Sequence, residues 1–150
     1  MIKTLKERLL ETYRTSSDYY EFVKIVFPEL RKVIKDLAKR TSLKSRVNNF
    51  QSQYVRELDN IKKLIFVVKG KLIFNKHAYI EVGVQVFVKD DSPHLKLFLI
   101  LWLYNHKNSS FHPESCFDCL LAEDSDFENV VEKVESWKTS KILPYLFASL

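Results

Sequence analysis

The stretch from Ile80 to Val88 constrains the fold of this chain more strongly than any other. Branched apolar residues occupy every second position of it, and Glu81, Gly83 and Gln85 lie between them. A period of two places all the branched side chains on one face of an extended backbone. The sequence therefore predicts a β-strand with one fully apolar face.

Apolar runs before and after this strand extend the predicted sheet. Residues 64–68 and 72–74 are rich in β-forming residues, and Lys69-Gly70-Lys71 between them predicts a hairpin, since glycine supplies the positive φ of a tight turn. The run Leu95–Tyr104 is apolar on all sides. A helix of that kind would have to be central to a small domain, so we favour a buried strand over a helix.

Helical periods precede and follow the predicted sheet. Apolar residues recur every three or four positions in four segments, the third starting at Pro28 and the fourth running from about Ser45 to Asn60. After the sheet we expect a short helix from His112 to Leu121 and a second helix through Trp137. The tail Ile142–Leu150 is expected to fold back as an apolar lid.

This order predicts an α+β fold with N-terminal helices, a central antiparallel three- or four-stranded meander and C-terminal helices. The length suits a single domain over residues 1–150. Within it we expect a basic helical half at 1–61, the sheet at about 62–104 and an acidic helical segment at 111–150.

The glycine and cysteine counts exclude several classes of protein. Phosphate-binding loops need glycines close together, but Gly70 and Gly83 lie 13 residues apart. Two cysteines are too few for a disulfide scaffold. The longest apolar run, Leu97–Tyr104, has 8 residues, whereas a transmembrane helix needs about 20. Without a secretory signal pattern, we expect a cytoplasmic protein with reduced cysteines and no membrane partner.

The formal charge of +5 is distributed unevenly along the chain. Residues 1–76 contain 18 Lys and Arg against 8 Asp and Glu, a net charge of +10. Residues 77–150 contain 6 against 11, a net charge of −5. On a helix, the basic residues that follow Pro28 lie opposite the apolar stripe, which predicts a positive face. We expect the partner-binding residues to be Arg31, Lys32, Lys35, Lys39, Arg40, Lys44 and Arg46.

Three interpretations of this basic face remain open. It could bind a polyanion such as a nucleic-acid backbone, with salt-sensitive affinity. It could dock on an acidic protein, including the acidic half of a second copy in a homo-oligomer. It could also be a solvated face that keeps the domain soluble. Aromatic residues on the same helices, such as Tyr13, Phe22 and Phe27, are best explained as core, although rings beside basic groups also suit base stacking.

A cluster of metal-type donors supports an alternative function, a zinc-containing domain. His106, His112, Cys116 and Cys119 lie within 14 residues, and thiolate and imidazole are preferred zinc ligands. Their spacing matches no common zinc module, and the two cysteines equally suit the buried side of a short helix. A deaminase-like or hydrolytic use of zinc would need a glutamate that the sequence at His77 lacks.

No catalytic residues can be assigned from these patterns. We therefore predict a non-enzymatic binding or adaptor module whose partner is an acidic protein or a nucleic-acid backbone. The zinc-containing domain is the alternative.

Overall fold

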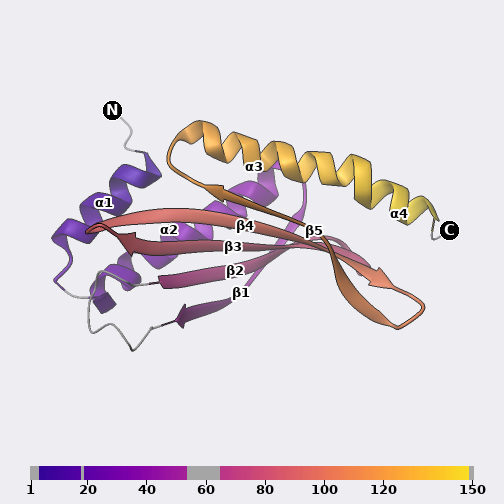
Figure 1. Ribbon diagram of the computed structural model, residues 1–150, viewed down its shortest axis with the longest axis horizontal. Helices are drawn as coiled ribbons and strands as arrows, with labels where there is room; N and C mark the ends of the chain where they lie inside the picture. The colour runs from indigo at the N-terminus through magenta and orange to yellow at the C-terminus, as the bar shows by residue number, and fades with distance from the viewer. Residues whose placement is uncertain (1–3, 18, 54–64, 149–150) are drawn as a thin grey trace.

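The computed structural model describes residues 4–17, 19–53 and 65–148, which contain a five-stranded antiparallel sheet with helices before and after it (Figure 1). The strands follow one another in space in chain order. The α+β class is confirmed, but the sheet has five strands instead of the predicted three or four. The elements are α1 (Leu5–Thr15), α2 (Tyr19–Arg40), β1 (Lys44–Gln53), β2 (Ile65–Asn75), β3 (Ala78–Lys89), β4 (Ser92–Asn105), β5 (Ser110–Leu120), α3 (Asp124–Trp137), the π-helical turn η2 (Lys138–Ile142) and α4 (Leu143–Ala148).

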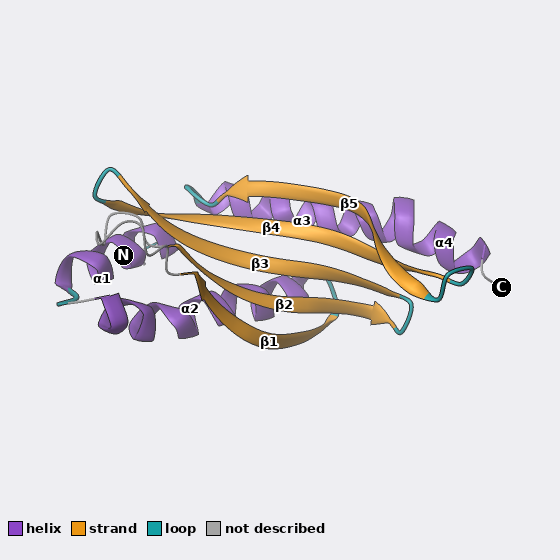
Figure 2. Cartoon of the chain, turned by 60° about the horizontal axis from the view of Figure 1, so that its bottom comes forward, coloured by secondary structure: helices purple, strands orange, loops and turns teal. Residues whose placement is uncertain are grey.

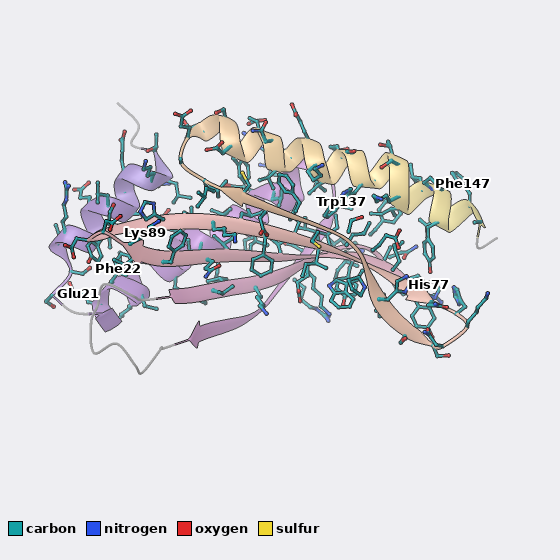
Figure 3. All side chains as sticks on the ribbon, in the orientation of Figure 1. Glu21, Phe22, His77, Lys89, Trp137 and Phe147 are labelled. Carbon is teal, nitrogen blue, oxygen red and sulfur yellow. The ribbon has the colours of Figure 1, made fainter. Side chains whose placement is uncertain are left out.

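The helices cover one face of the sheet. Figure 2 views the molecule from the other face, so that α2 and α3 lie behind the strands. Leu30 and Ile34 of α2 and Val134 of α3 are fully buried. The side chain of Trp137, the last residue of α3, is also buried, and Figure 3 labels it on the side of α3 that faces the sheet. Apolar side chains of β3 and β4 meet them at every second position. The hydrophobic core therefore lies between the helices and a single face of the sheet.

The two strands that were predicted most directly are present. β3 contains the alternating stretch 80–88, and its branched residues all point into the core. β4 contains the run Leu95–Tyr104, so the choice of strand over helix is confirmed. The turn between β3 and β4 has positive φ at Asp90 and Asp91, the geometry of a two-residue hairpin turn.

The predicted hairpin at Lys69-Gly70-Lys71 is wrong, because β2 runs through it without a turn. Neither glycine of the chain has a positive φ in the structure. A Cβ on Gly70 would lie 3.3 Å from methyl carbons of Ile34. The glycine therefore lets α2 pack close to the sheet, and its role is close approach instead of a turn.

Two further segments were predicted as helices and form the outer strands. Residues 45–53 of the predicted helix Ser45–Asn60 lie in β1, which pairs with β2; the rest of that helix lies outside the described residues. Residues 110–120 form β5, which pairs with β4, so the predicted helix His112–Leu121 is also wrong. The sheet thus extends well beyond residues 62–104. The expected boundaries of the basic helical half at 1–61 and the acidic helical segment at 111–150 shift accordingly.

Pro28 does not begin a helix but lies inside α2. A proline in a helix interior costs about 3 kcal/mol. Phe22 and Val26 before it, and Leu30 and Ile34 after it, are all buried on the same side of α2. Burial of each such side chain contributes about 1.5–3 kcal/mol, so one continuous helix is favoured over two.

Within the predicted lid Ile142–Leu150, the described residues 142–148 do not fold back but continue the helix. α3, η2 and α4 follow one another as a single helical rod (Figure 1). Pro144 lies in α4 directly after η2, whose π-helical turn interrupts the regular α-helical hydrogen bonding just before the proline. Ile142 is fully buried, whereas Phe147 near the end of α4 is 69% exposed.

Candidate functional site

The structure divides the predicted basic face between two surfaces on opposite sides of the sheet. One group, Arg31, Lys32, Lys35, Lys39 and Arg40, is exposed on α2. The other two residues lie in β1, where Arg46 pairs with Lys71 and Lys44 pairs with Ile73. Directly paired residues of an antiparallel sheet share a face, and this face points away from the helices. A single rigid partner therefore cannot lie flat on all seven residues.

The α2 surface contains a line of four basic residues, Lys24, Arg31, Lys35 and Lys39, which we call the basic strip. At 100° per residue they fall within an arc of about 80°, and all four are exposed. Lys24 was missed in the sequence because a helix start at Pro28 separates it from the other three. Within the described part of the chain, Lys24, Lys35 and Lys39 form no ion pair, and the Arg31 guanidinium lies 5.8 Å from the ring centre of Phe27.

The other two basic residues of α2 lie next to acidic side chains of the same chain. The Lys32 ammonium lies 4.0 Å from a Glu29 carboxylate oxygen. Arg40 donates to the Glu128 carboxylate of α3 and lies over the ring of Phe127. Both residues line a cleft of about 650 Å³ between the N-terminal helices and the start of α3. Its charged side chains include residues of both signs, and Arg8 and Glu29 also pair across it at 3.4 Å. The cleft therefore shows no preference for an anion or a cation.

The sheet surface opposite the helices, which we call the open face, is partly exposed and carries both rings and charges. Its rings come mostly from β3 and β4, at the positions that alternate with the buried ones. Its basic residues at paired positions are Lys44, Arg46, Lys69, Lys71, Lys89 and Lys96, its acidic ones Glu81 and Asp118, and its aromatic ones Tyr79, Phe87, His94, Phe98, Trp102, Tyr104 and Phe111. Sequence reasoning missed this face because it sought aromatics beside basic residues only on the helices.

Phe98 is held flat over the backbone of β3. It pairs with Gly83, and a Cβ on that glycine would lie 1.9 Å from Cζ of the Phe98 ring. The ring therefore occupies the volume that any other side chain would need. Gly83 is buried in consequence, although it lies on the open face. The outer surface of the Phe98 ring remains partly exposed.

A second group of rings lies along the same strands, toward the β2–β3 turn. The rings of Tyr79 and Trp102 are nearly parallel, 6.3 Å apart between centres, and the Lys71 ammonium lies 4.4 Å from the centre of the Tyr79 ring. Burial raises the pKa of the Tyr79 phenol, and the Glu81 carboxylate adds to this effect. The Tyr79 phenol adds no negative charge at neutral pH, where an unperturbed tyrosine is already protonated.

The four predicted zinc donors do not converge. Cys116 pairs with Ile100 on the open face, whereas Cys119 pairs with Leu97 on the helix side and packs against the core. His106 lies 4.9 Å from the ring of His77, and His112 lies 3.8 Å from a Glu114 oxygen. In the ranges that the structure describes, no three His, Cys, Asp or Glu side chains are placed to hold a metal. The zinc hypothesis stays a prediction that would require this hairpin to rearrange.

Partial removal from water lowers the pKa of His77, and the nearby His106 and Lys76 lower it further. The backbone N–H of His77 donates to Asn75 at 2.7 Å, and its carbonyl accepts from the Tyr104 N–H at 2.8 Å. These contacts fix the β2–β3 turn against the β4–β5 hairpin. Figure 3 shows His77 at this end of the sheet.

Comparison of the chain with models of protein families, with curated proteins and with solved structures gave no match. None of the described helices is long and apolar enough to cross a membrane.

Proposed function

We propose that the protein is a binding module that engages an acidic partner through the basic strip of α2. The observation that carries this proposal is the line of Lys24, Arg31, Lys35 and Lys39 on one continuous helix. None of the four forms an ion pair with the described residues, so their charges remain available. The buried stripe of α2 anchors the helix, which makes the line rigid.

The strip suits a partner with its own row of negative charges. From Lys24 to Lys39 the helix rises about 22 Å, long enough to face several phosphates or a patch of carboxylates. Such contacts attract a partner by its charge and release counterions. They do not depend on the sequence of the partner. The strip thus supports an acidic protein surface or a nucleic-acid backbone, which share this chemistry.

Reversal of two charges at the centre of the strip tests the proposal. We would titrate labelled heparin, labelled polyglutamate and duplex DNA into the wild type and Lys35→Glu/Lys39→Glu, following anisotropy at two salt concentrations. We expect at least one of these polyanions to bind the wild type at low salt. We expect its affinity to fall by about tenfold or more in the variant, because favourable contacts become repulsive. Which of the probes binds indicates the class of partner.

The matched control is Lys76→Glu/Lys107→Glu, which changes two exposed lysines in turns. Both double variants lower the formal charge from +5 to +1, so they differ only in where the charge is lost. A glutamate at position 39 also places a negative charge near the negative end of the α2 helix dipole, which lowers the stability of the helix. Circular dichroism must therefore confirm that both variants are folded. Equal loss of binding in both variants, or no binding to any of the polyanions, would refute the proposal.

A further inference from the structure

We propose that the open face of the sheet binds single-stranded nucleic acid, with bases stacked on its rings and phosphates held by Arg46, Lys69 and Lys71. This site goes beyond the basic strip, because it lies on the opposite side of the sheet from α2. It is assigned from three features: a fixed aromatic platform, a second group of rings along the same strands, and an excess of positive charge.

The platform is the Phe98 ring over Gly83. A Cβ at position 83 would overlap this ring at 1.9 Å, so the ring lies against the backbone of β3 and turns its other surface outward. A base can stack on such a ring without a prior rearrangement. Every base has a flat aromatic surface, so stacking of this kind tolerates any sequence.

The second group of rings lies about 13 Å along β4 from Phe98, because Trp102 is four residues further on. The parallel rings of Tyr79 and Trp102 form this group. The Lys71 ammonium already lies over the Tyr79 ring at 4.4 Å. Lys71 is the diagonal neighbour of Tyr79 on β2, because Ile73 pairs with Tyr79 and Lys71 with Glu81, and its ammonium places a positive charge next to the rings.

The charges of the face select an anion. Lys96 lies 3.3 Å from Asp118, whereas Arg46, Lys69 and Lys71 form no ion pair within the described ranges. Two copies cannot pair through this face without bringing these cations together. An acidic peptide would satisfy the charges but leave the rings unused. Single-stranded nucleic acid supplies phosphates and flat bases together, so it matches both features of the face.

The test is a fluorescence anisotropy titration with a labelled oligothymidylate of roughly ten nucleotides. We expect Phe98→Leu to weaken binding by about tenfold, because leucine still covers Gly83 but cannot stack. The matched control is Phe147→Leu, the same change on α4, far from the sheet face (Figure 3), and its affinity should equal that of the wild type.

Salt dependence tests the cations separately. Three phosphate contacts, made by Arg46, Lys69 and Lys71, predict that log K falls with log salt with a slope of about −2, and Lys69→Gln/Lys71→Gln should reduce that slope by about 1.4. Phe98→Leu should weaken binding of the oligothymidylate by the same factor in the Lys35→Glu/Lys39→Glu background as in the wild type, which separates this proposal from the previous one. No binding at low salt would overturn the inference, and so would equal binding by wild type and Phe98→Leu. Tighter binding of labelled polyglutamate that ignores position 98 would also overturn it, in favour of an acidic peptide.

Discussion

Replacement of Gly83 by alanine tests the contact on which the open face depends. The new Cβ would lie 1.9 Å from Cζ of Phe98 and 2.0 Å from Cε1, whereas carbon atoms in contact are about 3.5–4.0 Å apart. The ring must therefore retreat by roughly 1.5–2 Å. Overpacking of this kind costs about 1–3 kcal/mol. Alanine stiffens the unfolded chain and returns about 0.4–1 kcal/mol, so the net loss of stability is about 1–2 kcal/mol.

Urea denaturation of a double-mutant cycle measures this coupling. With an m-value of about 2 kcal/mol/M, Gly83→Ala should lower the midpoint by about 0.5–1 M. In a Phe98→Ala background there is no ring to displace, so the same change should be neutral or stabilising. The reasoning is refuted if Gly83→Ala has the same effect in both backgrounds. Gly70→Ala is the matched comparison, because its nearest atom, the backbone oxygen of Arg46, would lie at 3.1 Å and requires a much smaller shift.

Three further predictions concern the core, the histidine pair and the cysteines. Ile34→Ala should lower the free energy of unfolding by about 2–5 kcal/mol, because Ile34 is fully buried. Ile25→Ala is the control and should change it by no more than about 0.5 kcal/mol, because Ile25 is 47% exposed. Urea denaturation measures both variants. The pKa of His77 is lowered in the folded state, so the unfolded chain binds the proton more tightly. The contribution of neutral His77 to the free energy of unfolding is therefore complete above the unfolded pKa of about 6.5, and it is lost as the pH decreases through the folded pKa. NMR titration should place the midpoint of His77 below that value and shift it upward in His106→Ala, and an unchanged midpoint in the variant would contradict the assigned contact. Burial, with Asp126 nearby, raises the pKa of the Cys119 thiol, whereas Cys116 is exposed, so iodoacetamide should modify Cys116 first, as mass spectrometry of digests can show.

Patterns confined to one element were predicted correctly from the sequence. The alternation in 80–88 and the buried stripe from Leu30 to Leu37 both reflect burial of one side of a single element, which the order of residues records directly. The wrong predictions concern segments whose structure depends on a neighbouring strand or helix of the same chain.

The outer strands show this dependence on partners. Val47, Phe50 and Tyr54 are spaced as in a helix, yet residues 44–53 form β1 because β2 offers a complete edge to pair with. Pro113 suggested a helix start, but it lies in the edge strand β5 beside a register shift, where a missing N–H is tolerated. Gly70 suggested a turn because its contact with Ile34 is not visible in the sequence.

The same limit applies to the candidate sites. The sequence predicted a basic face, and five of its seven residues are indeed on α2, but it could not show that β1 carries Lys44 and Arg46 to the other side of the sheet. The sequence also could not show which basic residues form ion pairs. Arg40, for example, pairs with Glu128, which is 88 residues away in the sequence. The open face combines residues from several strands, so it exists only once their register is known.

Affinity capture from native lysate, with and without nuclease, tests the central claim most directly. Wild type, Lys35→Glu/Lys39→Glu and Lys76→Glu/Lys107→Glu would each serve as bait, and the retained species would be compared after a salt wash. We predict a species that the wild type and the turn variant retain and the strip variant loses, with nuclease treatment showing whether it depends on nucleic acid. Identical sets of retained species for all three baits would contradict the account.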